Sequence, residues 1–409
     1  MAGNRTGALV VQKYGGTSVG DAERIKRVAR RIAETAGRGN SVVVVVSAMG
    51  DTTDELIALA KQVARDPVDR EMDHLLATGE QVSASLTAMA LIDRGCPAVS
   101  LTAVQAGIRT TGLFSRARIA DIHPERIRRE LDEGRVPIVT GFQGITEDYD
   151  VTTLGRGGSD TSAVALAAAL AADRCEIYTD VEGIYTADPR VVPAARKLDE
   201  ISYEEMLELA QLGARVMHPR AVELGEVYDV PILVRSSFSD APGTLIHRIE
   251  NVEVRKHVRG IAHDTDVAKI RIHNVPDRPG IAAAIFTPLA DAGISVDTIV
   301  QNTSLDGKTD ISFTVTRADQ IRAVEMVKQV VPQIGAEHVD HSGELAKVSI
   351  VGTGMQSAPG YAARMFQTLA GAGINIDMIT TSDIRITCII AVDQVEPAMN
   401  ALHATFELD

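Results

Sequence analysis

The C-terminal third of the chain repeats itself at a constant offset of 80 residues, so this part should fold as two copies of one unit. The repeat covers 277–299 and 357–379, and its matched pairs are Pro279 with Pro359, Phe286 with Phe366, Gly293 with Gly373 and Asp297 with Asp377. Strand-like runs precede each copy (267–273, 346–352) and follow it (310–316, 383–392). The unit is therefore strand, Pro-Gly turn, helix, Ala-Gly turn, strand, strand. Because a unit this small buries little apolar surface, we expect the copies to pack against each other or against another subunit.

The N-terminal part alternates strand-like and helix-like stretches. Continuous apolar runs occur at 8–12, 41–47, 97–101, 136–141, 175–179 and 231–235, as in strands buried on both faces. Between them, apolar residues recur at helical spacing, and the patterns Thr52-x-x-Glu55 and Ser202-x-x-Glu205 predict capping boxes. This alternation predicts an α/β domain with a largely parallel sheet. The turn-forming segment 240–243 marks its end.

Composition excludes several classes of protein. A length of 409 residues predicts two or three domains, and a net charge of -14 argues against nucleic acid as the main partner. The three cysteines are far apart, which argues against a disulfide framework and fits a reducing compartment. We find no signal peptide, and the longest apolar run, 163–172, is too short to span a membrane, so we expect a cytoplasmic protein. His218-Pro-Arg220 lacks metal-ligand spacing, and we predict no metal-binding residues.

Two glycine-rich segments, each between a predicted strand and a predicted helix, are suited to anions. In 13–21 (Lys-Tyr-Gly-Gly-Thr-Ser-Val-Gly-Asp), glycines let a ligand approach the backbone, the helix start offers N–H groups, and Lys13 adds a charge. In 152–161 (Thr-Thr-Leu-Gly-Arg-Gly-Gly-Ser-Asp-Thr), three glycines surround Arg156, a side chain that reads carboxylates and phosphates. Spacing alone also fits a tight turn with a solvated lysine, or a flexible loop with an ordinary helix cap. The presence of two such segments in one domain favours anion binding.

Two further segments carry weaker signals. The segment 178–190 (Tyr-Thr-Asp-Val-Glu-Gly-Ile-Tyr-Thr-Ala-Asp-Pro-Arg) follows a predicted strand, and ligands of open α/β sheets bind beyond the carboxyl ends of strands. Its residues could hold a nucleotide, although Glu-Gly and Asp-Pro are also ordinary turn chemistry. Glu80 opens a helix-like stretch, where a glutamate is usually a surface charge. It becomes a candidate for binding an ammonium group only because the other segments imply a zwitterionic substrate.

At these residues the sequence resembles the aspartokinase family. Segment 13–19 is similar to the family's Lys-Phe-Gly-Gly-Thr-Ser signature, with Tyr14 in place of the common phenylalanine, and 153–161 is similar to a second signature. The resemblance covers almost the whole chain. It implies an amino-acid kinase fold (a mainly parallel sheet sandwiched by helices) over 1–244, followed by two βαββαβ ACT modules over 245–340 and 341–409, with an edge near 245–265 that both modules share.

The resemblance also implies site residues. Catalytic roles fall to Lys13, Arg156 and Asp160. Aspartate would be held by Thr53, Glu80, Arg156, Gly157, Gly158 and Ser159. ATP would be bound by Lys13, Tyr14, Gly15, Gly16, Ser47, Thr179, Asp180, Tyr185, Asp188, Pro189, Arg190 and Arg215, the last standing where the family often has lysine. In this assignment Glu80 binds the substrate ammonium and Arg156 its α-carboxylate.

The implied reaction is transfer of the γ-phosphoryl group of ATP, with Mg²⁺, to L-aspartate, giving 4-phospho-L-aspartate on the way to lysine, threonine and methionine. The nucleophile is a carboxylate that is already ionised at pH 7, so no general base is needed and none is visible. Catalysis must then depend on positioning and positive charge. Two alternatives remain: a kinase of the same fold acting on glutamate or another acyl substrate, and an amino-acid sensor without turnover.

The ACT modules imply regulation by lysine, threonine or both at a site between the modules. Candidate effector-binding residues are Asp277, Ala282, Ile294, Gln301, Asn302, Asn375, Ile376 and Thr381. A surface used only for dimerisation is the alternative. We expect a homo-oligomer formed through the ACT modules, or a larger assembly that includes a shorter subunit made from the same C-terminal region.

Overall fold

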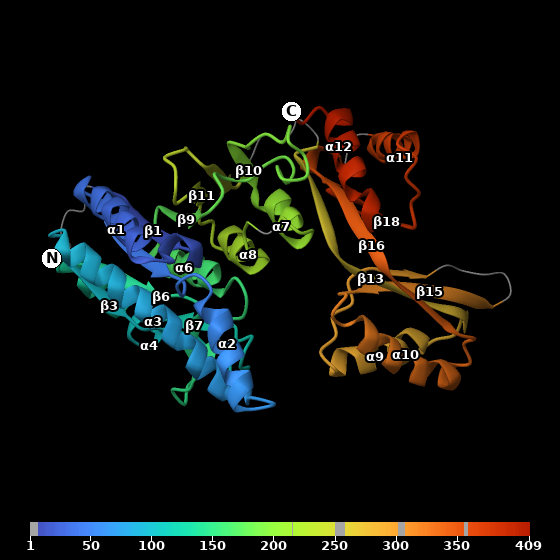
Figure 1. The fold of residues 1–409 in the computed structure, drawn as a ribbon, viewed down its shortest axis with the longest axis horizontal. Helices are drawn as coiled ribbons and strands as arrows, with labels where there is room; N and C mark the ends of the chain where they lie inside the picture. The colour runs from blue at the N-terminus through green and yellow to red at the C-terminus, as the bar shows by residue number, and fades with distance from the viewer. Residues whose placement is uncertain (1–6, 215, 250–257, 302–306, 356–358) are drawn as a thin grey trace. The chain divides into compact units, whose positions relative to one another are not determined.

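The computed structural model describes residues 7–214, 216–249, 258–301, 307–355 and 359–409. These residues form two compact units (Figure 1). Among the described residues, the first unit takes those that lie within 1–185 and 197–252, and the second takes those within 186–196 and 253–409. The segment 186–196 therefore belongs to the second unit, although it lies within the predicted kinase domain in sequence.

The first unit is an α/β domain built on an eight-stranded sheet with the order β10-β12-β11-β9-β1-β2-β6-β3. Its strands are β1 (Leu9–Tyr14), β2 (Ser41–Val46), β3 (Ala98–Leu101), β6 (Val136–Thr140), β9 (Arg174–Thr179), β10 (Glu200–Ser202), β11 (Ile232–Ser236) and β12 (Thr244–His247). All pairs are parallel except β11 with β12. The predicted parallel sheet is confirmed, because the apolar runs at β1 and β2 are buried along almost their whole length.

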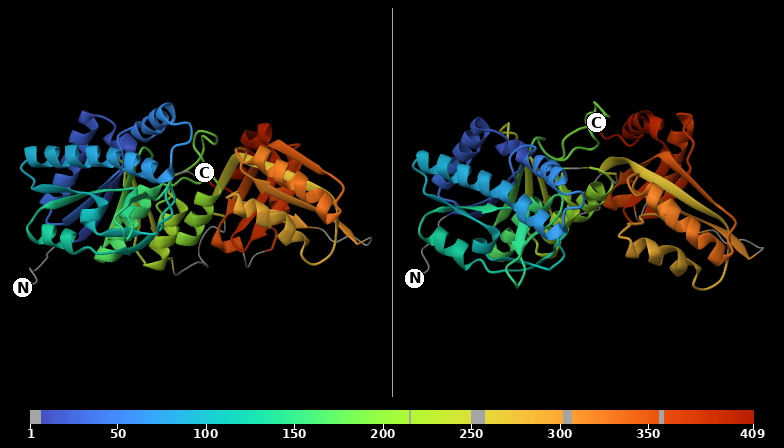
Figure 2. Two further views of the ribbon diagram at one scale, coloured as in Figure 1. Left: turned by 90° about the horizontal axis from the view of Figure 1, so that it is seen from below. Right: turned by 60° about the horizontal axis from the view of Figure 1, so that its bottom comes forward.

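Helices cover both faces of this sheet, as Figure 2 shows. They are α1 (Ala22–Gly37), α2 (Thr52–Val63), α3 (Asp69–Asp93), α4 (Ala103–Ala106), α5 (Glu125–Asp132), α6 (Gly158–Leu170), α7 (Tyr203–Gln211) and α8 (Pro219–Val227). The predicted capping box at Ser202 is confirmed. The one predicted at Thr52 is wrong, since Asp51 precedes α2 and makes no side-chain capping bond.

A small second sheet, β5-β4-β7-β8, completes the first unit and was not predicted. It consists of β4 (Ile108–Thr110), β5 (Ile119–Ile122), β7 (Gln143–Ile145) and β8 (Val151–Thr153). By length and composition α3 is apolar enough to cross a membrane. Half of its most apolar window is nevertheless buried in the unit, which is the pattern of a core helix.

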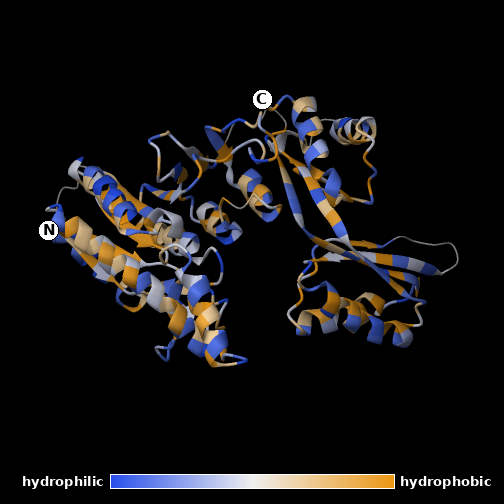
Figure 3. Cartoon of the chain, viewed as in Figure 1, coloured by the Kyte–Doolittle hydropathy of each residue, from blue (hydrophilic) through white to orange (hydrophobic). Residues whose placement is uncertain are grey.

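The second unit consists of two similar modules that share one six-stranded sheet, β14-β15-β13-β16-β18-β17. The first repeat supplies β13 (Gly260–Pro276), α9 (Ile281–Asp291), β14 (Ile299–Gln301), β15 (Lys308–Val315) and α10 (Gln320–Ile334). The second supplies β16 (Val339–Val351), α11 (Tyr361–Gly371), β17 (Met378–Ser382), β18 (Arg385–Ala391) and α12 (Val395–Thr405). Along β13 and β16, hydrophobic and hydrophilic residues alternate (Figure 3), so one face of the sheet packs on helices. The other face is mostly polar, apart from an apolar cluster of Leu345, Met378 and Ile389.

The two modules exchange strand segments instead of dividing at residue 340. One core gathers 268–339, while the other combines 258–261 with 346–408 and includes Ala187 and Val192. The aspartates matched in the repeat make reciprocal ion pairs, Asp377 with Lys269 (2.6 Å) and Asp297 with Lys347. The copies therefore pack against each other, as the repeat predicts.

Candidate active site

A cavity of about 620 Å³ opens at the carboxyl ends of β1 and β2 in the first unit. Its walls come from the loops after these two strands, from one side of α2 and α3, and from the turn before α6. Ten predicted site residues line it: Lys13, Gly15, Gly16, Ser47, Thr53, Glu80, Arg156, Gly157, Gly158 and Ser159. The two cationic residues from the separate glycine-rich segments therefore share one cavity.

Lys13 is held by a carboxylate in the first turn of α6. Its Nζ lies 2.6 Å from Oδ1 of Asp160, and both side chains are about nine-tenths buried. The strand β1 places the ammonium at the sheet edge, and the helix start places the carboxylate beside it. This ion pair fixes the direction of the lysine, while the N-terminus of α6 adds a field that attracts anions to the same cavity.

The first glycine loop is shaped by close backbone contacts. The N–H of Gly15 donates to the carbonyl of Tyr178 (3.2 Å), and that of Gly50 donates to the carbonyl of Gly16 (3.1 Å). A Cβ on residue 16 would lie 2.8 Å from the carbonyl oxygen of Ala48, closer than real Cβ contacts. Glycine is thus required where the loops after β1 and β2 meet at the cavity wall.

The turn that carries Arg156 is fixed from two sides by charged side chains. On one side, Asp73 of α3, fully buried, accepts from the N–H of Thr153 (2.8 Å) and from its hydroxyl (2.6 Å). On the other, Arg220 donates to the carbonyl of Leu154 (2.8 Å). Gly157 has a φ of +68°, and a Cβ there would meet the His218 ring at 2.4 Å. His218 thus packs against the turn that carries Arg156, and Arg220 holds the same turn by a hydrogen bond.

Glu80 of α3 is a buried carboxyl group in the cavity. Its Oε1 accepts from the N–H of Ala48 (3.0 Å), and its Oε2 is buried with no hydrogen-bond partner among the described residues. Burial raises the pKa of Glu80 to about 7, against the opposing effect of its backbone hydrogen bond. A buried carboxylate with one unused oxygen is suited to receive a cationic ligand group.

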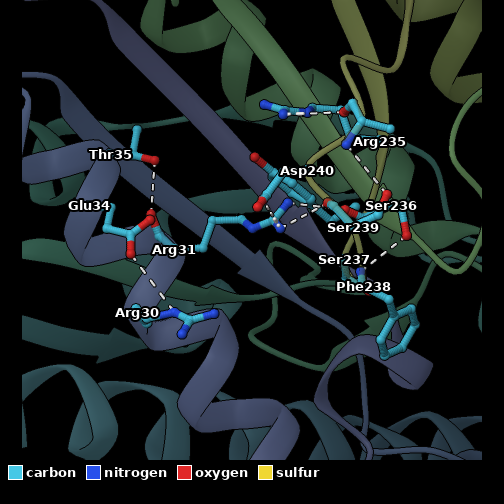
Figure 4. A network of polar contacts seen from close by, with 12 residues as sticks. Arg30, Arg31, Glu34, Thr35, Arg235, Ser236, Ser237, Phe238, Ser239 and Asp240 are labelled. Atoms are coloured by element: carbon cyan, nitrogen blue, oxygen red, sulfur yellow. Dashed lines mark hydrogen bonds and ion pairs between the residues drawn. The ribbon is translucent and has the colours of Figure 1, made fainter.

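A network around Arg31 supports the neighbouring part of the sheet edge (Figure 4). Arg31 of α1 donates to the carbonyls of Ser236 and Ser239, both at 3.0 Å, and to the carboxylate of Asp240. The N–H of Ser237 in turn donates to the carbonyl of Thr179 at 2.8 Å. The helix thereby fixes the loop after β11 against the end of β9, where the nucleotide-binding residues were predicted.

Comparison with known proteins identifies the family. Residues 8–236 match the amino acid kinase family, and 269–331 and 348–406 each match an ACT domain model. The aspartokinase of Mycolicibacterium smegmatis is 54% identical over 406 residues, which are 98% of this chain and 96% of that relative. The chain belongs to the aspartokinase family. It is thus an ATP-dependent kinase with an amino-acid kinase fold and C-terminal ACT domains, as predicted.

Two solved structures agree with this aspartokinase architecture. Both are of E. coli aspartokinase III, one in complex with aspartate and ADP (R-state) and one with lysine and aspartate (T-state). Their TM-scores are 0.81 and 0.76. Each is 29% identical to this chain, and each match covers 97% of this chain and 99% of the other.

Not every predicted ATP-binding residue lines the cavity of this aspartokinase. The ring of Tyr14 is fully buried and stacks on Tyr178 with centroids 4.7 Å apart, so the side chain has a packing role instead of the predicted nucleotide contact. Thr179 ends β9, beside β1 in the sheet, and Asp180 and Tyr185 follow it. The segment 188–190 belongs to the second unit, where Arg190 pairs with Asp188 at 2.7 Å. Arg215 lies outside the described residues.

The structure adds residues that the sequence argument missed. Lys61 of α2 is a further cation at the cavity wall, and Asp54, Asp69, Ser115 and Phe142 also line it. Asp73 holds the turn that carries Arg156 through its hydrogen bonds with Thr153. One signal for Asp73 was available: it lies seven residues before Glu80 in a helix whose other members of that face are buried. Because acidic side chains are almost never buried without a partner, two of them on the buried face of one helix indicate a polar site next to that face.

Proposed function

We propose that this aspartokinase transfers the γ-phosphoryl group of ATP to the β-carboxylate of L-aspartate, giving 4-phospho-L-aspartate and ADP. The observation that carries the proposal is the single cavity that brings together Lys13, Arg156 and the buried carboxylate of Glu80. Lys13 and Arg156 would match the two carboxylates of the substrate and Glu80 its ammonium group, while Lys61, Asp54 and Asp69 add further charges at the cavity wall. The R-state structure of E. coli aspartokinase III, which holds aspartate and ADP, is consistent with such a substrate pair.

The chemistry needs positive charge and no general base. The β-carboxylate of aspartate has a pKa of about 3.9 and is ionised at neutral pH, so it is already a nucleophile. The barrier comes from bringing one anion against another, and fixed cations reduce it most when their side chains do not have to reorganise. Lys13, held by Asp160, would stabilise the transferring phosphoryl group, and the N-terminus of α6 would add to its field.

The remaining cavity groups orient aspartate. Arg156 would bind the α-carboxylate and Glu80 the ammonium, so that the β-carboxylate points toward Lys13. Thr53 and Ser159 supply hydroxyl groups at the same walls. Asp73 and Arg220 hold the turn that carries Arg156, so the backbone at Arg156 is already in place before the substrate binds. This arrangement lowers the entropy cost of the reactive geometry.

ATP would lie along the edge formed by the glycine loop, Ser47 and the end of β9. Mg²⁺ would accompany the phosphates and neutralise part of their charge. The cavity has features suited to both groups. Its wall at Gly16 has no room for a side chain, so phosphates could approach the backbone there. Asp54 and Asp69 line the same cavity and offer carboxylate oxygens, the ligands that Mg²⁺ prefers. These carboxylates would hold the ion together with the phosphates. We expect the enzyme to work in the cytoplasm.

Trapping the acyl phosphate tests the proposal directly. With MgATP and hydroxylamine, we expect aspartate to give a hydroxamate and glutamate to give little or none. A preference for glutamate would mean that glutamate, not aspartate, is the substrate. Binding of aspartate and ATP without ADP release would leave the non-catalytic sensor as the correct reading.

We further propose that lysine, threonine or both regulate the enzyme through the ACT modules. Asp277 precedes α9, Gln301 ends β14 and Thr381 lies on β17, while Asn302 falls outside the described residues. The edge strands β14 and β17 expose Ile299 and Ile379, which suits pairing with a second copy of the chain. The other candidates for effector contact are Ala282, Ile294, Asn375 and Ile376.

Effector titration separates regulation from simple dimerisation. Activity should fall when lysine, threonine or their mixture is added, and Asp277→Ala should shift the required concentration upward. If neither amino acid changes activity or binds to the protein, the module pair serves assembly only. Light scattering in the same samples would show a homo-oligomer, and co-purification would reveal a shorter subunit.

A further inference from the structure

A cluster of histidine and carboxylate side chains lies on the polar face of the ACT sheet, within the second unit. His273 is near the end of β13, and His338 directly precedes β16. The two residues face each other, because the N–H of His273 donates to the carbonyl of His338 at 3.0 Å. Asp340, two residues further along, projects from the same side as His338. This side is opposite to Ile270 and Ile272, which are buried under the helices.

The three side chains direct their polar atoms at one point. Nε2 of His273 lies 2.8 Å from Oδ2 of Asp340, and Nε2 of His338 lies 3.8 Å from the same oxygen. One ligand atom from each residue falls within 4.8 Å of the others. In a tetrahedral site with bonds of about 2.0 to 2.2 Å, ligand atoms lie roughly 3.3 to 3.6 Å apart, so only a modest contraction is needed.

The contraction requires His338 to turn. Its ring now stacks on that of His273, with centroids 4.2 Å apart and planes 9° from parallel, whereas shared coordination needs the rings tilted. The side chain of His338 is 51% exposed and that of Asp340 is 66% exposed, so both can move without disturbing the core. His273, with 17% of its side chain exposed, is the fixed member.

The opposite nitrogen of each ring faces a second carboxylate. Nδ1 of His273 lies 3.5 Å from Asp310, and Nδ1 of His338 lies 3.6 Å from Glu337. Asp310 accepts from the N–H of Asn274 at 3.0 Å, and the Asn274 side chain contacts Glu337. Carboxylates that orient the outer nitrogens of metal-bound histidines are typical of protein metal sites. Here both Nδ1 atoms have such a partner while both Nε2 atoms converge.

We propose that His273, His338 and Asp340 bind a divalent transition-metal ion of the zinc type, with water completing the coordination. Two imidazoles favour such an ion over Mg²⁺ or Ca²⁺, which prefer oxygen ligands. The site would join the end of β13 to the start of β16, the two central strands of the ACT sheet. It is separate from the Mg²⁺ that would accompany ATP.

Zinc titration of the full-length protein tests the site. Protein freed of metal by chelation and carrying no histidine tag should bind one equivalent of Zn²⁺ in calorimetry. His338→Asn and Asp340→Asn should each weaken that binding at least 10-fold, and Glu337→Gln should weaken it about 10-fold through the outer partner. His341→Asn is the matched control, because His341 is on the same strand but bonds to Gln320 of α10.

Two further measurements complement the titration. X-ray absorption at the zinc edge should show two imidazole ligands, and Zn²⁺ should raise the melting temperature of the wild type but not that of His338→Asn. Equal Zn²⁺ affinity in His338→Asn and in the His341→Asn control would overturn the proposal. A zinc spectrum without imidazole ligands would overturn it as well.

Discussion

Single residues at the cavity have roles that burial and charge define. Glu80 is the clearest example, because its carboxylate is buried, its pKa is raised to about 7 and one of its oxygens has no hydrogen-bond partner among the described residues. A substrate ammonium would supply the missing partner and favour the ionised form. Burial of this carboxylate destabilises the free enzyme. Binding of the substrate ammonium would relieve this cost and so strengthen substrate binding.

Replacing Glu80 should weaken aspartate binding selectively. The change Glu80→Gln removes a charged hydrogen bond worth about 1.5 to 3 kcal/mol, which corresponds to a KM for aspartate raised roughly 10- to 100-fold. The KM for ATP should hardly change. Steady-state kinetics measures both, with Glu71→Gln on the exposed side of the same helix as control. An equal rise in both constants would mean that Glu80 only supports the fold.

The raised pKa of Glu80 should also appear in the pH dependence of the free energy of unfolding. The folded pKa of Glu80 is about 7, against 4.5 for the ordinary carboxyl, so the folded state binds this proton more tightly than the unfolded state. Its contribution to the free energy of unfolding is then fully present below about pH 4.5 and is lost as the pH rises to about 7. In urea titrations, Glu80→Gln should gain stability relative to wild type across this window. A flat difference would contradict the assigned pKa.

Elements place these residues by contacts that are far apart in the sequence. The strands β1 and β2 were predictable because their β-branched runs are long and buried on both faces. The sheet β5-β4-β7-β8 was not predictable, because strands of three or four residues carry too little periodicity. Asp73 was missed for a similar reason: its partners are backbone groups of Ser115 and Thr153, 42 and 80 residues away.

Removing the Asp73 carboxylate should loosen the turn that carries Arg156. Asp73→Asn leaves buried N–H groups poorly satisfied, so we expect a loss of about 1 to 3 kcal/mol in the free energy of unfolding. The KM for aspartate should rise while that for ATP changes little. Asp93→Asn, at the exposed end of the same helix, is the control. A stability loss with unchanged aspartate kinetics would show that Asp73 does not position Arg156.

At the scale of the whole molecule, sequence order and structural units differ. The repeat followed from the 80-residue offset and the ACT modules from the family resemblance, whereas the exchange of strand segments and the membership of 186–196 followed from neither. Val192 shows why: it is buried in the same core as residues of α11 and α12, about two hundred positions later in the chain. The hydrophobic pattern of a short stretch of sequence cannot predict a contact with residues so far along the chain.

Truncating Val192 should therefore weaken the second unit. Val192→Ala removes buried methyl groups worth about 1.5 to 2 kcal/mol. Hydrogen exchange should speed up in β16, β18 and α12, with β1 and β2 unaffected. Val227→Ala, at an exposed position of the first unit, is the control. Faster exchange confined to the first unit would contradict the assignment of 186–196.

The turnover number of Lys13→Met is the decisive measurement for the proposed reaction, which depends on a fixed cation beside the phosphoryl group. With saturating aspartate and MgATP, we expect kcat to fall at least about 100- to 1000-fold, while circular dichroism and thermal unfolding remain close to wild type. The surface variant Lys26→Met should keep full activity. A Lys13→Met enzyme that folds normally and turns over at a near-normal rate would contradict the account.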